Sequence, residues 1–149
     1  MAWTFSDDVL AENPGPAQAL TQGRKKQRSP SSSVTPLQAA FETLYRQLGG
    51  VGEWEYNYRF LPGRRYELDY ALPAIRVGIE VNGGQWVKSG HSSGRGLHRD
   101  ADKQNRAIEA GGCIFWLTTD MLSPNANPEH VARIVRYIRG RLHDAREGE

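Results

Sequence analysis

The first regular pattern of hydrophobic residues lies between positions 35 and 48 and predicts a helix. Apolar side chains recur there at intervals of three and four: Leu37, Ala40, Phe41, Leu44 and Leu48. Thr35 and Gln38 have the spacing of a capping box, and Pro36 falls at the first helical position. Gly49 and Gly50 follow, so we expect the helix to end before them.

Three segments with a two-residue period come next and predict three consecutive strands. In residues 54–60 an aromatic side chain occupies every second position: Trp54, Tyr56, Tyr58 and Phe60. Residues 66–71 alternate in the same way, with Asp69 at a polar position. Residues 76–81 place apolar side chains on one face and Glu80 on the other. Turns containing proline separate the three segments.

The second half of the chain continues with a helix, a strand and a helix. Residues 98–110 are polar but compatible with a helix, and residues 113–117 form the apolar run of a buried strand. After Asn127 and Pro128, a last helix presents one apolar face: Val131, Ile134, Val135, Ile138 and Leu142. The order is therefore α-β-β-β-α-β-α. A crossover helix before the fourth strand predicts an α/β fold with a mixed four-stranded sheet and flanking helices.

Composition divides the 149 residues into two parts. Residues 1–34 combine proline, serine and a basic cluster, and we expect them to form a flexible tail outside a domain of residues 35–149. No apolar run approaches the roughly 18 residues of a membrane span, and the first residues lack the pattern of a secretory signal. A single cysteine, Cys113, excludes a disulfide framework. These features predict a cytoplasmic protein without a membrane partner.

Basic residues are clustered although the net charge is only +2. The candidate DNA contacts lie in the tail, beside the first predicted hairpin and after the third strand: Arg24, Lys25, Lys26, Arg28, Arg64, Arg65, Lys88, Arg95 and Arg99. Clusters of this kind suit contacts with phosphate groups. A solvated surface is the alternative for any one of them, and it is about as common.

Two carboxylates, Asp69 and Glu80, interrupt otherwise apolar strands. A carboxylate buried alone is costly, so each needs a cationic partner or a metal ion. A short turn joins the two strands and can bring both side chains to one face. Mg²⁺ is commonly held by one or two carboxylates, and it assists displacement at phosphorus. The alternative is ion pairing with neighbouring arginines: Arg64, Arg65 and Arg76.

The run from Tyr66 to Asn105 resembles a known group of nucleases. A helix bearing a glutamate, an acidic residue on each of two joined strands, and then a helix and a strand look like the PD-(D/E)XK fold. The segment IEVNGGQW, followed by KSGHSSGRGLHRDADKQN and IFWL, is similar to the branch near the very-short-patch-repair endonucleases and small phage-encoded endonucleases. The resemblance extends from Thr35 to Leu142 and implies a restriction-endonuclease-like fold.

The resemblance also implies a role for each acidic residue. Asp69 matches the central metal-bridging aspartate, Glu80 matches the second acidic residue, and the Val81 carbonyl becomes a further metal ligand. Glu42 matches the helical glutamate of the family, with an ion pair to Arg46 as the alternative. The implied cofactor is Mg²⁺, with Mn²⁺ also accepted.

The chain departs from the family at Asn82, where the resemblance calls for a lysine. An amide cannot act as a base or supply positive charge, so another side chain or the metal alone must replace it. The candidates are Gln85, Lys88, His91 and Lys103. His91 matches a histidine of the phage proteins and can exchange a proton near neutral pH. Lys103 lies on the following helix, from which it could reach back over the sheet.

These inferences predict a Mg²⁺-dependent endodeoxyribonuclease of the phage-encoded kind, with His91 and Lys103 as catalytic residues beside Asp69 and Glu80. Its partner would be DNA in the host cytoplasm, and a homodimer would allow paired cuts. The alternative is a non-catalytic nucleic-acid-binding module on the same fold, which the missing lysine favours. Three acidic residues in one expected pocket disfavour it, because carboxylates that face phosphate do not assist binding.

Overall fold

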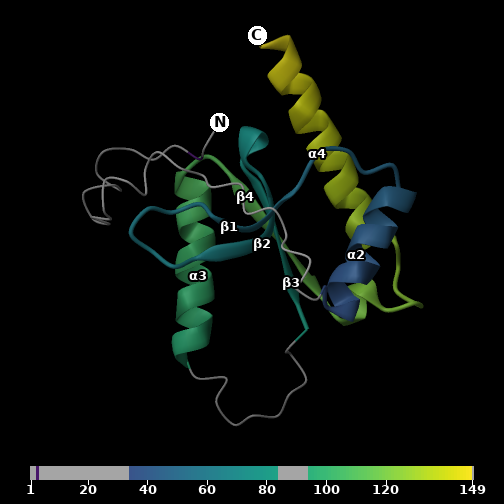
Figure 1. The fold of residues 1–149 in the computed structure, drawn as a ribbon, viewed down its shortest axis with the longest axis horizontal. Helices are drawn as coiled ribbons and strands as arrows, with labels where there is room; N and C mark the ends of the chain where they lie inside the picture. Colours follow the sequence, from purple (N-terminus) through teal and green to yellow (C-terminus); the bar gives the residue numbers. More distant parts are fainter. Residues whose placement is uncertain (1–2, 4–33, 84–93, 149) are drawn as a thin grey trace.

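The computed structural model describes residue 3 and residues 34–83 and 94–148 (Figure 1). Its regular elements follow in this order: α2 (Pro36–Gln47), β1 (Glu55–Arg59), β2 (Glu67–Leu72), the 3-10 helix η2 (Pro73–Ile75), β3 (Val77–Asn82), α3 (Gly94–Glu109), β4 (Cys113–Thr118), the 3-10 helix η4 (Asp120–Leu122) and α4 (Glu129–Glu147). The helices and strands expected after residue 34 are present, with ends that differ by a few residues.

The four strands form one sheet in the order β1-β2-β3-β4. β1 and β3 each pair antiparallel with β2, whereas β4 pairs parallel with β3 after the crossover helix α3. α3 lies on one side of the sheet, and α2 and α4 lie on the other (Figure 1). The prediction of an α/β protein with a mixed four-stranded sheet is therefore confirmed.

Hydrophobic side chains fill both faces of this sheet. The core between the sheet and the pair α2 and α4 is the larger one, and its most buried members include Phe41, Tyr70, Ile79 and Ile138. The core beneath α3 contains Leu68, Ala107 and Ile114. Gly78 permits the close approach of β2 and β3 there, because a Cβ at this position would lie 2.6 Å from a Leu68 methyl group.

The predicted alternation of β3 is confirmed, whereas that of β1 and β2 is wrong at one point in each strand. Tyr56 packs against the core of α2 and α4, but Tyr58 belongs to the core beneath α3. In β2, Tyr70 belongs to the core of α2 and α4, whereas Leu68 belongs to the core beneath α3. Asn57 has a positive φ of 49°, a left-handed conformation that breaks the regular pleat of β1. Asp69 lies between the two β2 residues, so β2 changes face at the candidate aspartate.

Trp3, within the segment predicted to form a tail, packs in the core of the domain. Residues 1–34 were expected to lie outside the fold, but Trp3 is only 5% exposed and belongs to the core beneath α3. Its ring centre lies 4.8 Å from that of Phe60, and a Cβ at Gly112 would come within 2.8 Å of the indole. A single aromatic residue without periodic neighbours gives no pattern, so the sequence could not reveal this contact.

The start of α3 also differs from expectation. The pattern placed it near His98, whereas the helix begins at Gly94. Glycine is a poor helix former, so Gly94 and Gly96 concealed the first turn. The helix ends at Glu109, and Gly111 follows with a positive φ of 73°. α3 is therefore long enough to bring Lys103 to β2 and β3 and to pack Ala107 in the core beneath it.

Candidate active site

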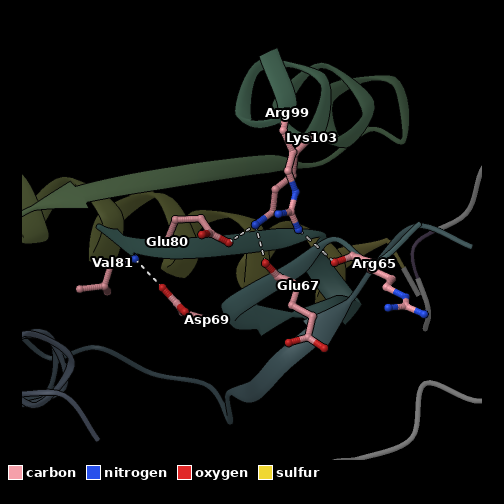
Figure 2. A network of polar contacts seen from close by, with 7 residues as sticks. All are labelled: Arg65, Glu67, Asp69, Glu80, Val81, Arg99 and Lys103. Atoms are coloured by element: carbon pink, nitrogen blue, oxygen red, sulfur yellow. Dashed lines mark hydrogen bonds and ion pairs between the residues drawn. The ribbon is translucent and has the colours of Figure 1, made fainter. Parts of the chain in front are cut away.

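Asp69 and Glu80 lie on the neighbouring strands β2 and β3, one position beyond the pair Tyr70 and Ile79. Backbone pairing joins Tyr70 to Ile79, so Asp69 and Glu80 are the next residues along each strand. The Asp69 Oδ2 accepts a hydrogen bond of 2.7 Å from the Val81 N–H (Figure 2). The carboxylate thus takes the place of a backbone acceptor. The change of face in β2 directs Asp69 toward the end of β3.

Lys103 approaches Glu80 from α3 (Figure 2). Its Nζ donates to Glu80 Oε1 at 2.5 Å and also donates to the backbone carbonyl of Glu67. Lys103 is only 8% exposed, which is uncommon for a lysine. The prediction that Lys103 reaches back over the sheet is therefore confirmed in its geometry. Its catalytic role stays a prediction.

Burial opposes the ionisation of both carboxylates. It raises the pKa of Asp69, although the Val81 N–H and the charge of Lys103 act in the opposite direction. Burial also raises the pKa of Glu80 despite its bond with Lys103, and the negative charges of Asp69 and Asp100 add to this effect. Two neighbouring carboxylates thus act on Glu80 in addition to the ammonium group of Lys103. A further positive charge at this point would favour their ionised forms.

The chemistry of these donors suits a divalent cation. Asp69 and Glu80 each use one carboxylate oxygen in the hydrogen bonds described above, and the second oxygen of each is a potential ligand. The Val81 carbonyl belongs to the same end of β3. Mg²⁺ requires no more than one or two protein carboxylates, because water and phosphate oxygens complete its octahedron. The pair therefore fits Mg²⁺ better than ions that need a larger set of side chains.

Glu42 does not join this pair in a three-carboxylate cluster. Within residues 34–83 and 94–148, no group of three or more His, Cys, Asp or Glu side chains is placed to hold a metal ion. Glu42 Oε1 instead accepts a hydrogen bond of 2.8 Å from the hydroxyl of Tyr70. The Tyr70 ring belongs to the core of α2 and α4, on the face away from Lys103. A metal-ligand role for Glu42 therefore stays a prediction.

Three of the predicted DNA-contacting arginines, Arg64, Arg65 and Arg99, lie where the chain before β2 meets α3. Arg99 of α3 donates to the Arg65 carbonyl at 3.5 Å (Figure 2). Its guanidinium carbon lies 5.7 Å from the centre of the Tyr66 ring, within the range of a cation–π contact. The charge of Arg64 also acts on Tyr66. Positive charge therefore gathers where the first turn of the sheet meets α3.

Other predicted residues lie outside the described part of the chain. They include three candidates for the missing lysine and the basic cluster of the tail: Gln85, Lys88, His91, Arg24, Lys25, Lys26 and Arg28. Arg95 falls in the first turn of α3, but its side chain is also outside the described part. Of the four candidate replacements, Lys103 is the one whose contacts with the carboxylates can be followed, while Asn82 ends β3.

Sequence patterns did not reveal how α3 is attached to β2. The Tyr66 hydroxyl donates a hydrogen bond of 2.6 Å to Asp102 Oδ2. The Asp102 carboxylate also accepts from Arg106 Nε at 3.0 Å. The i,i+4 spacing of Asp102 and Arg106 was a visible signal, but no local pattern connects Tyr66 with Asp102, which lies 36 residues later in the chain. The proximity of Asp100 to Glu80 was missed for the same reason.

Comparisons with known proteins assign no family. No protein-family model, curated protein or solved structure matches the chain. In the part of the chain that the structure describes, no helix is both long enough and apolar enough to cross a membrane. The functional argument therefore rests on the side chains of the site.

Proposed function

We propose that this chain is a Mg²⁺-dependent DNA endonuclease with a restriction-endonuclease-like fold, and that Asp69, Glu80 and Lys103 are its catalytic residues. The observation that carries the proposal is the convergence of these three side chains between β2, β3 and α3. Metal-dependent hydrolysis of a phosphodiester needs ligands for a divalent cation, and positive charge near the phosphoryl oxygens assists it. This group of side chains supplies both.

Each side chain has its own part in this proposal. Asp69 and Glu80 would hold Mg²⁺ between β2 and β3, with the Val81 carbonyl as a further ligand. Bound Mg²⁺ would neutralise charge on the phosphate and make the attacking water more acidic. Lys103 would direct its compact positive charge at the phosphoryl oxygens, where negative charge develops. Lys103 would thereby replace the lysine that the family carries at the position of Asn82.

The balance of charges supports a functional site over a structural ion pair. Lys103 pairs with Glu80, yet the negative charges of Asp69 and Asp100 still raise the pKa of Glu80. An ion pair that served only stability would gain nothing from the added negative charge. Groups with pKa values perturbed by burial and by specific neighbours are typical of active sites.

A nucleic-acid-binding module without catalysis is the second candidate. Arg99, one turn of α3 before Lys103, would favour DNA binding under either proposal. However, buried carboxylates repel phosphate unless a cation lies between them. A surface used only for binding therefore leaves Asp69 and Glu80 without an explanation, and we favour the nuclease.

The test is the nicking of supercoiled plasmid by the purified chain in Mg²⁺. We expect conversion to the open circular form, because one site per chain cuts one strand. The reaction should stop in EDTA and in the Asp69→Asn variant. Asp144→Asn is the matched control, since it makes the same change at an exposed position of α4. Equal nicking by the parent and Asp69→Asn would reject the proposal.

A further inference from the structure

Two adjacent contacts attach the start of β2 to α3 next to the active site. The hydroxyl of Tyr66 donates to Asp102 Oδ2 at 2.6 Å, and the Nζ of Lys103 donates to the carbonyl of Glu67. Tyr66 directly precedes β2, and the contacts join consecutive residues of the chain on both sides, 66 to 102 and 67 to 103. Any movement of Asp102 away from Tyr66 therefore displaces the backbone that carries Lys103.

The Tyr66–Asp102 contact is a strong one. Although burial raises the pKa of Asp102, hydrogen bonds from Tyr66 and Arg106 lower it overall, so the carboxylate is ionised at neutral pH. A hydroxyl that donates to an ionised carboxylate forms a charge-assisted bond. Arg106 holds the same carboxylate through its Nε, at 3.0 Å from both oxygens. Asp102 is thus fixed from within α3 and offers a defined acceptor to β2.

Lys103 needs such support because its side chain is long and flexible. A lysine loses a large part of its rotamer entropy when it is held in one conformation. Its ammonium is shared between the Glu67 carbonyl and Glu80, on two different strands. Both contacts require α3 to keep its position along β2. The Tyr66–Asp102 bond is the polar contact between the two elements that lies next to Lys103 in sequence.

We propose that Tyr66 is a positioning residue for Lys103, acting through Asp102. Tyr66 does not reach the reacting atoms; it sets the place of the ammonium group that the proposed nuclease uses. This inference rests on the proposed function for its catalytic consequence. The effect on the ammonium itself can be measured whether or not the chain cleaves DNA.

The first measurement is the ¹⁵N resonance of the Lys103 ammonium group, assigned by its loss in Lys103→Met. A buried, hydrogen-bonded ammonium should exchange its protons slowly with water. Tyr66→Phe keeps the ring and removes the hydroxyl, and we expect exchange to accelerate about tenfold, because loss of one hydrogen bond makes local opening of α3 from residues 66 and 67 easier. Asp102→Asn should act in the same direction. Tyr58→Phe is the matched control, because Tyr58 packs in the same core but its phenol lies against the backbone of Trp3.

The second measurement is the single-turnover cleavage rate. Tyr66→Phe should lower the rate without changing the DNA concentration at half-saturation, and Tyr58→Phe should leave both unchanged. In a Lys103→Met background, Tyr66→Phe should have no further effect, since the group that it positions is gone. The inference would be overturned if the Lys103 ammonium exchanged its protons at the same rate in Tyr66→Phe as in the parent. It would also be overturned if Tyr66→Phe lowered the cleavage rate by the same factor in the Lys103→Met background as in the parent. If the parent does not cleave DNA, the proposed function is rejected. The measurement of ammonium exchange still tests whether Tyr66 positions Lys103.

Discussion

The Asp69 carboxylate is partly buried, which makes its ionised form less favourable than in water. Burial raises its pKa above the ordinary 3.8, and neither the Val81 N–H nor Lys103 fully offsets this. The folded protein therefore binds a proton at Asp69 more tightly than the unfolded chain does. The free energy of unfolding therefore falls as the pH rises from the ordinary pKa of Asp69 through the raised one. Above the raised pKa the loss is complete and persists. A residue proposed to bind a cation thus destabilises the protein without it.

Asp69→Asn should accordingly raise the free energy of unfolding at neutral pH. The amide removes the charge, and its oxygen can still accept the hydrogen bond from Val81. For a chain of this size, each kcal/mol gained corresponds to roughly 2–4 °C in the unfolding temperature. Thermal unfolding should show this gain at neutral pH and a smaller one at acid pH, where Asp69 itself is protonated. A variant less stable than the parent at neutral pH would show that Asp69 has a structural role.

Glu80→Gln should weaken Mg²⁺ binding strongly. The substitution keeps the shape of the side chain but removes one of two proposed carboxylate ligands, and it leaves the charge of Lys103 uncompensated. Isothermal titration calorimetry with Mg²⁺ measures the effect. Glu67→Gln is the control, because the Glu67 carboxylate pairs on the surface with Arg59 at 2.9 Å. If Glu80→Gln and the parent bind Mg²⁺ equally well, the cation lies elsewhere.

Lys103 and His91 make different predictions about pH. If Lys103 supplies fixed positive charge, Lys103→Met should slow cleavage without altering the pH profile, and Lys103→Arg should recover part of the rate. If His91 is the base, the rate should rise through roughly pH 6–7. His91→Ala should then lose that inflection together with about 10²–10⁴-fold in rate. Rates near that of the parent in both Lys103→Met and His91→Ala would exclude both side chains.

At the scale of the elements, local patterns predicted some features well and missed others. The helix α2 and the alternation of β3 could be predicted because their caps and periods are local. The change of face in β1 and β2 could not, since it depends on the left-handed conformation of Asn57 and on packing against two cores. The orientation of Asp69 follows from this irregularity. The residue was therefore identified from the sequence, but its hydrogen bond to Val81 was not.

The N-terminal segment gives a prediction at the same scale. Trp3 fills the core between Phe60 and Gly112, so Trp3→Ala should leave a cavity beneath α3. Replacement of a buried Trp by Ala typically costs about 3–5 kcal/mol. Urea unfolding of Trp3→Ala should show a lower midpoint, whereas Val34→Ala, at a position 36% exposed, should change it little. An unchanged midpoint in Trp3→Ala would mean that the indole contributes nothing to the fold.

At the scale of the whole molecule, the sheet explains why the site forms where it does. β2 and β3 are antiparallel neighbours, which brings Asp69 next to Glu80, and the crossover helix α3 places Lys103 over both. The convergence of the two carboxylates could be predicted from the order of the elements. The hydrogen bond of Glu42 to Tyr70 could not, because it depends on how α2 packs on the opposite face.

The central claim is that these side chains cleave DNA and do not merely bind it. The most direct test compares the parent with Asp69→Asn and Lys103→Met on one fluorescent DNA duplex in Mg²⁺, with binding followed by anisotropy and cleavage followed under single-turnover conditions. We predict that all three proteins bind with similar affinity and that both variants lose about 10²-fold or more of the cleavage rate. DNA binding by the parent without Mg²⁺-dependent cleavage, or equal cleavage by all three proteins, would contradict this account.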